Sequence, residues 1–598
     1  MQCPTFAKAL IVADNDRLAA QLSAIFARPG TYVPVMDGPR LQRPDGENEV
    51  VRRNNAAARV QPRQIFLAGL SRESELSFRG HFPQSRTYSV PFETDLRALS
   101  ERVPGAPTGY LDWGCDNIGL GLLQALYSRQ LLRFHDTSSA SLPVRGRSTH
   151  LVVCSDCDPL GQVIAANYAY SLGAGLCMIP ATNKEEAKSV MERFYTLYDN
   201  RENSPTEGLA ALTLDMRRLC GPLPLDGVES LTFITDHLPF GFAFGDIPSS
   251  HLFTYPDLGI AVINGFAMGQ KGARGVEVAV LVDPRTTDAP EIPRTTESLY
   301  RKGVFVRGYN GEVATVRNVQ QEVELFPYDL LLVATHCGDP PGWRWTYEFQ
   351  DSEGIDRVLV VDVAASFSRV GPDLIHVVQQ DRFVSLDGVD WNDPEKKKTL
   401  YVGKAILDFT SRTEDLQPTI RESIDRVVGS KVLKMYDHNY LPLPKQIALQ
   451  HTPIIINNAC GSWDELAATF LFGNARAYVG TLYMISTTEA SEVVCGVLDR
   501  HFNEPLALAF WRSQQEAYGD QLRRPYVVTG VFTQTFGASE GNIPAKILEE
   551  MRQAKEYWAS IDVDASSPKH LKRDVDDALA FYSREIRQFE TNWEPSPP

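Results

Sequence analysis

Short apolar runs alternate with helix-like runs through the second half of the chain, and this alternation constrains the fold more than any other feature. VEVAVLVDP predicts a strand, TTESLYRKG a short helix that ends at Gly303, VFVRGYNG a strand, ATVRNVQQEVELF a helix, and YDLLLVATHCG a strand that ends at His336. Strands that alternate with helices favour a parallel sheet whose crossover helices cover its faces.

The pattern resumes after a long excursion over residues 339–450, which holds its own strand-like run, RVLVVDVAASF. TPIIINNACGS predicts a strand that ends at Cys460, DELAATFLFGN a helix and ARAYVGTLY another strand. The last 60 residues predict helix, because apolar residues recur there every three or four positions. They are Leu571, Val575, Leu579, Tyr582, Ile586 and Phe589.

The first half also predicts an α/β arrangement. A strand over Ala9 to Ala13 precedes a helical pattern, and a second strand runs from Gln64 to Leu70. Between them, residues 37–63 are rich in Arg, Asn, Pro and Gly and indicate a long loop. Further on, HLVVCS and GLCMIPA flank a helical stretch, and Asn183 is a suitable cap for the helix that follows.

These patterns divide the chain into four segments. Residues 1–145 form an N-terminal α/β segment with a long Arg- and Pro-rich loop, and residues 146–272 form a second α/β segment that regulates or binds partners. Together they predict a Rossmann-like N-terminal half. Residues 273–540 carry the alternating pattern described first, and residues 541–598 form a helical tail.

Composition excludes some functions. The net charge of -16 argues against a broad surface for nucleic acid or membrane lipid. No apolar run is long enough to cross a bilayer, and the N-terminus does not resemble a secretory signal. The nine cysteines are irregularly spaced, and several lie inside apolar runs, so we expect a reducing cytoplasm and no disulfide framework.

His336 and Cys460 are the residues that point most directly to chemistry. Each follows an apolar strand-like run and precedes a glycine-containing turn. Because ligands bind outside the carboxyl ends of parallel strands, neighbouring strands would bring the imidazole and the thiol to one cleft. The imidazole would take the thiol proton, since the thiolate is the reactive form. The helix predicted after Cys460 would favour the thiolate further.

At these residues the chain resembles a known family. The order strand–helix–strand–helix–strand–His followed by strand–Cys, with LLLVATHCG and IIINNACGS at its two key points, is similar to the caspase-like fold of clan CD cysteine peptidases. The closest resemblance is to the CHAT group. NARAYVGTLYMISTTEASEVVCGVLDRHF and NEPLALAFWRSQQ resemble the segments that follow the cysteine in that group. The resemblance covers roughly residues 275–540.

The resemblance implies a caspase-like three-layer α/β fold for residues 273–540 and a cysteine endopeptidase acting on a protein substrate. His336 would be the general base, Cys460 the nucleophile, and the backbone amides of Gly338 and Cys460 the oxyanion donors. Neither a cofactor nor a metal is implied. CHAT proteins occur in bacterial antiviral defence and cell-death systems, so a regulatory partner is expected to act on the N-terminal half. Asp339 and Asp464 are near the pair in sequence, and either would suit a basic P1 side chain.

Two other functions stay open. Cys337 stands directly after the histidine, where the family usually has glycine, so the chain would also suit a catalytically inactive caspase-like scaffold that binds proteins. The N-terminal half would alternatively bind a small nucleotide as a signal or process a nucleotide as an enzyme, although its Gly119 and Gly121 lack the spacing of a phosphate loop. Cys154 and Cys157 form an isolated CxxC, which we interpret as structural because no second half-site accompanies it.

Overall fold

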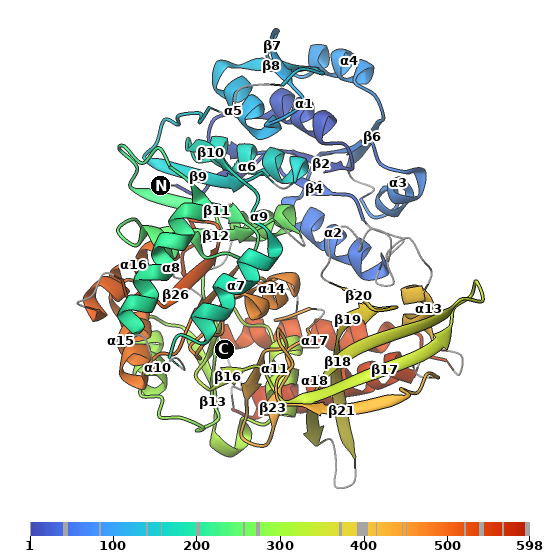
Figure 1. Cartoon of the computed structure of the whole chain (residues 1–598), viewed down its shortest axis with the longest axis vertical. Helices are drawn as coiled ribbons and strands as arrows, with labels where there is room; N and C mark the ends of the chain where they lie inside the picture. The colour runs from blue at the N-terminus through green and yellow to red at the C-terminus, as the bar shows by residue number, and fades with distance from the viewer. Residues whose placement is uncertain are drawn as a thin grey trace, which may run out of the picture.

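The computed structural model describes residues 2–39, 46–82, 85–138, 142–156, 158–198, 204–254, 257–270, 275–369, 374–391, 405–413, 415–444, 446–449, 451–518, 522–537, 543–564, 567 and 569–592. Within these residues the protein is a mixed α/β structure built around one large sheet (Figure 1). In their spatial order the strands of that sheet are β10 (Gly175–Ile179), β9 (His150–Ser155), β11 (Ser230–Thr235), β12 (Ser249–Phe253), β26 (Tyr526–Gly530), β25 (Ala477–Thr481), β24 (Ile454–Asn457), β15 (Leu330–Val333), β13 (Val278–Asp283) and β14 (Phe305–Asn310).

This central sheet is mostly parallel, as the alternation of strands and helices predicts. Neighbouring strands pair in parallel throughout, except β25 and β26, which are antiparallel. The pairing of β12 with β26 joins strands of residues 146–272 to strands of residues 273–540. The segment boundary predicted near residue 272 therefore falls within one continuous sheet.

Alternate residues of each strand pack on opposite faces of the sheet, as the two-residue period of a strand requires. Leu331 and Val333 of β15 belong to one apolar core, whereas Leu330 and Leu332 belong to another. The first core includes residues of α7 (Lys184–Tyr195), α8 (Pro205–Cys220), α11 (Val316–Leu325), α14 (Glu465–Phe472), α17 (Ile543–Ser560) and α18 (Lys569–Asn592). The second includes residues of α10 (Glu291–Arg301), α15 (Thr487–Cys495) and α16 (Leu506–Ala517).

A smaller parallel sheet forms the N-terminal end of the molecule. Its strands are β4 (Val35–Asp37), β2 (Ala9–Ala13), β5 (Gln64–Ala68) and β6 (Arg86–Val90). The helices between residues 16 and 128 share a third apolar core with α6 (Pro159–Ser171) and α9 (Leu258–Ala267). The remaining elements of this region are β1 (Thr5–Phe6), β3 (Thr31–Tyr32), α1 (Asp16–Phe26), α2 (Gly46–Val60), α3 (Arg72–Arg79), α4 (Thr94–Arg102), β7 (Gly109–Gly114), α5 (Ile118–Ser128) and β8 (Gln130–His135).

The prediction of a long loop over residues 37–63 is wrong for most of that segment, because residues 46–60 form helix α2. The polar residues that indicate a loop are partly buried by tertiary contacts. The side chain of Arg53 is fully buried and forms ion pairs with Asp37, Glu49 and Asp257. A helix whose arginine is neutralised by buried carboxylates need not follow an apolar period.

The excursion between His336 and Cys460 forms an antiparallel sheet that projects from the body of the molecule (Figure 1). Its strands are β20 (Val389–Asp390), β19 (Ile375–Leu386), β18 (Asp356–Arg369), β17 (Gly342–Gln350) and β21 (Ile420–Ile424), and α13 (Ala405–Ser411) packs on it. A small sheet near its base contains β16 (Cys337–Gly338), β22 (Val432–Lys434) and β23 (Asn439–Tyr440).

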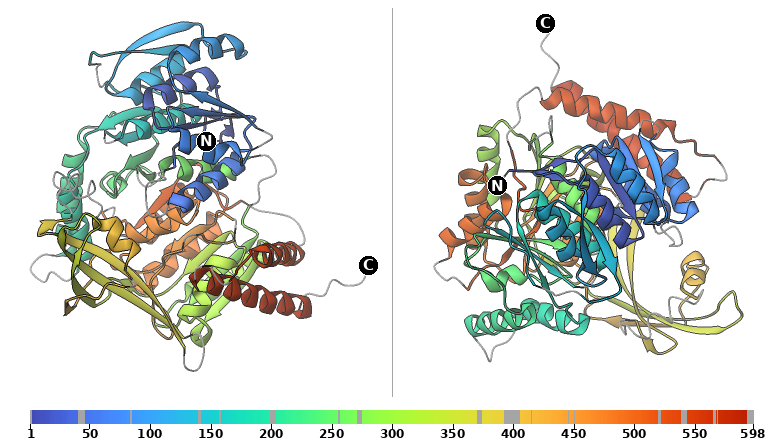
Figure 2. Two further views of the ribbon diagram at one scale, coloured as in Figure 1. Left: turned by 90° about the vertical axis from the view of Figure 1, so that its right-hand side faces the viewer. Right: turned by 90° about the horizontal axis from the view of Figure 1, so that it is seen from above.

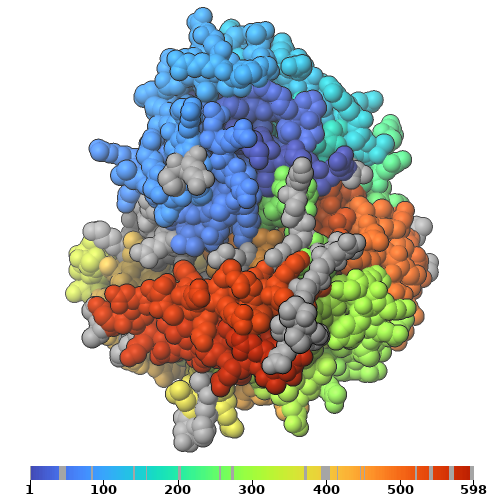
Figure 3. Space-filling view, turned by 180° about the vertical axis from the view of Figure 1, so that it is seen from behind, coloured from blue at the N-terminus to red at the C-terminus, as the bar shows by residue number. Residues whose placement is uncertain are grey.

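The C-terminal segment is helical, as predicted, and consists of α17 and α18. The two helices pack on each other, α18 also contacts α11, and both helices are exposed on the back of the molecule (Figures 2 and 3). Single-turn helices lie at η1 (Phe240–Phe244), η2 (Gly311–Val313) and η3 (Gly496–Arg500). Among the described residues, none of the helices combines the length and the apolar character that crossing a bilayer requires.

Candidate active site

The strands that precede His336 and Cys460 are direct neighbours in the central sheet. β15 and β24 pair in parallel, and Val333 lies opposite Asn457 at the end of the ladder. His336 and Cys460 each follow by three residues, so both emerge from the same edge of the sheet. The adjacency that the apolar runs predict is therefore present.

The His336 ring is oriented by a backbone carbonyl. Its Nε2 lies 3.1 Å from the carbonyl oxygen of Thr286, in the segment that follows β13. Because a carbonyl only accepts hydrogen bonds, Nε2 carries the proton in the neutral ring and Nδ1 is the basic nitrogen. His336 is exposed to solvent. This arrangement suits a general base, whose free nitrogen takes a proton while a third group holds the ring.

The Cys460 thiol is partly buried and rests on the backbone of Ile485, which follows β25. It donates to the Ile485 carbonyl at 3.6 Å and accepts from the Ile485 N–H at 3.4 Å. Burial raises the pKa of the Cys460 thiol, and the Ile485 N–H opposes that shift. In the described part of the chain, no direct hydrogen bond joins this sulfur to the His336 ring. The Cys460 sulfur is thus held by the backbone of Ile485 rather than by the imidazole.

The turn that carries Cys460 is fixed by a buried hydrogen-bond network. The Ser462 hydroxyl donates to the Asn457 carbonyl and accepts from the Thr481 N–H, at 3.0 and 3.1 Å. The Thr481 hydroxyl donates to the Ala459 carbonyl at 2.7 Å, and the Tyr478 hydroxyl donates to the Ser462 carbonyl at 2.6 Å. Residues on both sides of Cys460 are therefore tied to β25, which fixes the position of the thiol.

A second buried group holds the strand end from the opposite face. The Asn458 side chain donates to a carboxylate oxygen of Glu291 at 2.6 Å and accepts from the Tyr526 hydroxyl. Glu291 is 2% exposed, and burial raises its pKa. The network thus reaches from α10 through β24 to β26.

Tyr195 of α7 covers the two glycines that follow the predicted dyad. A methyl group placed on Gly461 would lie 3.6 Å from its Cδ2, and one placed on Gly338 would lie 3.3 Å from its hydroxyl oxygen. The backbone N–H of Asp339 donates to that hydroxyl at 3.5 Å. The turns that contain the predicted oxyanion donors, the amides of Gly338 and Cys460, therefore lie against an aromatic ring from the N-terminal half.

Asp339, one of the two predicted P1-binding carboxylates, is neutralised by two cations. Arg426 donates to it at 2.8 Å, and the Lys431 ammonium lies 3.4 Å away. Its side chain is 1% exposed. The cations also flank Tyr195: the guanidinium carbon of Arg426 lies 4.2 Å and the Lys431 nitrogen 3.7 Å from the ring centroid. Arg426 in turn pairs with Glu192, one turn earlier on α7.

Asp464, the other predicted P1-binding carboxylate, is paired with His237 at 2.5 Å. Burial alone would lower the pKa of His237, but Asp464 raises it to about 9. The neighbouring Glu465 has a pKa raised to about 7, chiefly by burial and then by the charge of Asp464. Both predicted carboxylates thus lie in ion pairs beside the candidate dyad.

The structure adds residues that local sequence patterns did not indicate. Tyr195 and His237 come from the first half of the chain, and Arg426 and Lys431 come from the excursion between the two candidate catalytic residues. None of them lies in a motif, and each is more than 25 residues from both His336 and Cys460. Only tertiary packing brings them to the site.

The other cysteines do not form a competing site. Cys337 lies in β16, and burial raises its pKa to about 12. Cys154 of the CxxC is buried, and Cys157 lies outside the described residues. Over the described ranges, the cysteines form no disulfide, and no cluster of His, Cys, Asp and Glu suits a metal ion.

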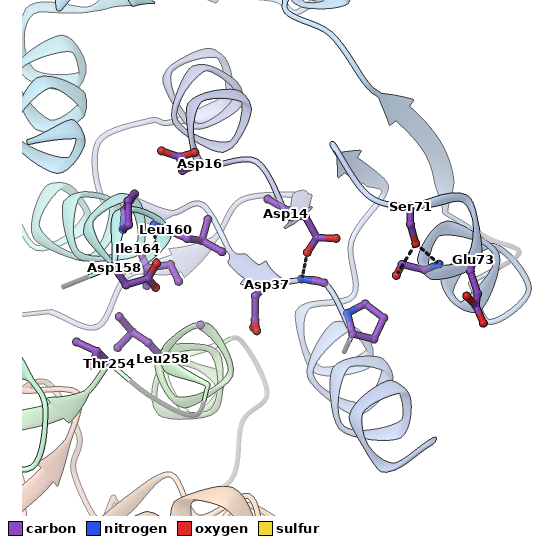
Figure 4. A pocket seen from close by; sticks show the side chains of 16 residues that line it. Asp14, Asp16, Asp37, Ser71, Glu73, Asp158, Leu160, Ile164, Thr254 and Leu258 are labelled. Atoms are coloured by element: carbon purple, nitrogen blue, oxygen red, sulfur yellow. Dashed lines mark hydrogen bonds between the residues drawn. The ribbon is translucent and has the colours of Figure 1, made fainter. Parts of the chain in front are cut away.

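The N-terminal half contains a cavity of about 700 Å³ at the ends of β2 and β4 (Figure 4). Acidic side chains dominate its polar lining, and they are Asp14, Asp16, Asp37, Glu73 and Asp158. The phosphates of a nucleotide would be repelled by these carboxylates. The cavity therefore offers no support to nucleotide binding, which was one of the alternatives left open by the sequence.

Comparisons with known proteins identify no family. No protein-family profile matches the chain, and no curated protein matches it. A solved structure with a detectable likeness is Cwp6 from Clostridium difficile, at 11% identity and a TM-score of 0.23 over 58% of this chain and 62% of that chain. The matched part thus spans less than two thirds of that structure. A likeness this weak carries no argument about fold or function.

Proposed function

We propose that this protein is a cysteine endopeptidase of the caspase-like type, in which His336 and Cys460 form the catalytic dyad. The observation that carries the proposal is the register of β15 and β24, which brings both residues to one edge of one sheet. The chain order β13–α10–β14–α11–β15–His336, then β24–Cys460, supports the caspase-like assignment. The tautomer imposed on His336 by Thr286 supports its role as base.

In the proposed reaction the imidazole acts first as a base and then as an acid. His336 Nδ1 takes the Cys460 proton, and the thiolate forms a bond to the substrate's carbonyl carbon. The tetrahedral oxyanion would accept hydrogen bonds from the backbone amides of Gly338 and Cys460. As the peptide C–N bond breaks, the imidazolium returns its proton to the leaving amine. Water then adds to the thioester and releases the acid and the free thiol.

A basic P1 side chain is the substrate feature that the surrounding charges support best. Asp339 and Asp464 lie in the segments that follow His336 and Cys460, and each is already paired with a cation of this chain. A substrate guanidinium or ammonium would take the place of one of these internal cations. The proposal of a basic P1 residue therefore requires that Asp339 or Asp464 first releases its internal partner.

Regulation by the N-terminal half is supported by direct contacts at the site. Tyr195 packs against Gly461, and His237 pairs with Asp464. Both residues lie before residue 273. A partner that changes the N-terminal half would therefore act on the loops around the thiol without a long relay.

A peptide with a C-terminal arginyl acyloxymethyl ketone tests the proposal, because this electrophile alkylates an activated catalytic thiol. Mass spectrometry should find one adduct on wild type and none on Cys460→Ala. His336→Ala should slow the reaction by about a hundredfold, the usual contribution of a general base. Cys115→Ala, which removes an exposed thiol, is the matched control and should behave as wild type. An adduct that persists in Cys460→Ala would refute the assignment.

A second candidate is a catalytically inactive scaffold that binds proteins. It is favoured by the Cys460 thiol, which is hydrogen-bonded to Ile485 rather than to His336, and by burial that raises its pKa. The same labelling experiment separates the two candidates. For a scaffold, His336→Ala would leave the reactivity of Cys460 unchanged.

A further inference from the structure

The contacts of Tyr195 are those of a group that occupies a binding site. Its ring lies against Gly461 and its hydroxyl against Gly338, so it bridges the turns that follow Cys460 and His336. A peptide substrate must present its carbonyl to the backbone of these turns. The ring and a substrate chain would therefore compete for the same volume.

Charged groups hold the ring in this position. Arg426 and Lys431 lie against the aromatic ring, and the Asp339 N–H donates to the hydroxyl. Two cations over one ring form an attractive cation–π arrangement. The Lys431 side chain is only 7% exposed, so water screens its contact weakly. The closed position of Tyr195 is thus stabilised by the hydrogen bond to its hydroxyl as well as by the two cations that lie against its ring.

The helix that carries Tyr195 is firmly anchored. The adjacent Phe194 is fully buried, and its ring packs against Phe242 at 5.0 Å between centroids. Moving α7 as a whole would expose Phe194 and Val190, which is costly. Rotating the half-buried Tyr195 side chain breaks only its own contacts. Opening by side-chain rotation is therefore the cheaper motion.

We propose that Tyr195 is an internal gate that closes the candidate active site and swings away to admit substrate. This inference rests on the proposed function, since it assigns a regulator to the same thiol. The Glu192–Arg426–Asp339 chain of ion pairs is the latch, because the two carboxylates hold the Arg426 guanidinium against the ring. A partner that withdraws Glu192 or Arg426 would free the ring.

The rates at which two maleimides alkylate Cys460 test the gate. N-ethylmaleimide is small, whereas a maleimide on a short neutral peptide needs the space that Tyr195 fills. Tyr195→Ala should accelerate the peptidyl maleimide about tenfold, as expected if the open state is a minor population. Tyr195→Phe, which keeps the ring, should stay within about twofold of wild type. Tyr557→Ala, which removes an exposed tyrosine of α17, is the matched control.

The same measurement in a His336→Ala background separates the gate from the dyad. In this background Tyr195→Ala should still accelerate the peptidyl maleimide, because the ring no longer fills the space. Any activation of the thiol by His336 is lost. An acceleration by Tyr195→Ala in both backgrounds supports the gate even if His336→Ala alone has no effect, which would refute only the dyad. An unchanged or slower rate in folded Tyr195→Ala would overturn the gate.

If Tyr195→Ala does not fold, the Arg426→Gln variant tests the proposed gate instead. It removes one cation from the ring and unties Glu192 while Lys431 stays in place. We expect a smaller acceleration of the peptidyl maleimide, by about threefold, because half of the cation–π contact remains. A rate equal to that of wild type in folded Arg426→Gln would overturn the gate.

Discussion

His237 and Asp464 join the two halves of the chain beside the candidate nucleophile, with His237 Nδ1 lying 2.5 Å from Asp464 Oδ1. Both residues have a positive φ, 44° for His237 and 64° for Asp464. L-residues other than glycine rarely adopt such values, and strained backbone of this kind gathers at functional sites. The pair therefore combines an electrostatic tie with backbone strain at the start of α14.

Replacing Asp464 by glycine or by alanine separates these two effects. Both variants lose the pair with His237, but only glycine relieves the strained φ. We expect Asp464→Gly to be more stable than Asp464→Ala by about 1 kcal/mol. Urea unfolding near neutral pH measures the difference. Glu93, with φ of -61°, is the control, and there alanine should be the more stable. Equal stabilities of the two Asp464 variants would argue against strain.

His451 should make the stability depend on pH. It lies 3.1 Å from both Asp329 and Glu550, and its side chain is 17% exposed. Burial alone would lower the pKa of His451, but the two carboxylates raise it to about 9. The stabilisation is full below about 6.5, the pKa of an unfolded histidine, and is lost as the pH rises through about 9.

The loss expected over that window is about 3 kcal/mol, from a shift of the His451 pKa by between two and three units. Thermal unfolding of wild type and His451→Gln across the window measures it, and the variant should show a flatter profile. His438→Gln, at an exposed position, should retain the wild-type profile. Parallel profiles for wild type and His451→Gln would contradict the prediction.

The buried ion pairs of α2 should be essential to the N-terminal half. Arg53→Met leaves Asp37, Glu49 and Asp257 without their shared cation, and removing one partner of a buried network costs about 3–5 kcal/mol. Arg79→Met breaks an exposed pair with Glu75 and should cost less than about 0.5 kcal/mol. Denaturant unfolding compares the two. A similar cost for both would show that burial of Arg53 is not decisive.

Asn458 should position the nucleophile's strand end. Asn458→Ala removes the donor to buried Glu291 and the acceptor for Tyr526, which leaves two polar groups unsatisfied at a cost of about 2–4 kcal/mol. Tyr526→Phe removes one of the two bonds and should cost about half as much. Calorimetry measures the loss of stability in both variants. A larger loss in Tyr526→Phe than in Asn458→Ala would contradict this account.

Cys337 should be the least reactive thiol of the site. Burial raises its pKa to about 12, so its thiolate at neutral pH is about a thousandfold scarcer than that of an ordinary cysteine. Iodoacetamide followed by peptide mass spectrometry should therefore modify exposed Cys115 readily and Cys337 last. Modification of Cys337 before Cys460 would show that Cys337, rather than Cys460, is the accessible thiol.

Much of the fold could be predicted from local patterns, because strands and helices of the central sheet have clear hydrophobic periods. LLLV and IIIN form the buried strands β15 and β24, and the apolar stripe of the last residues forms α18. Asn183 caps α7 through the Glu185 N–H, as its position predicts. The candidate dyad could be predicted for the same reason, since both residues directly follow such strands.

What surrounds the dyad could not be predicted, because it depends on contacts between residues far apart in the chain. By itself the sequence determined the strands and helices of the central sheet and the edge where His336 and Cys460 emerge, since burial and periodicity act locally. The tertiary structure decided that the two halves share one sheet through β12 and β26, that Arg53 stabilises a helix in a loop-like segment, and that Tyr195 covers Gly461. Charge neutralisation and aromatic packing at long range leave no periodic trace in sequence, so only the folded chain reveals them.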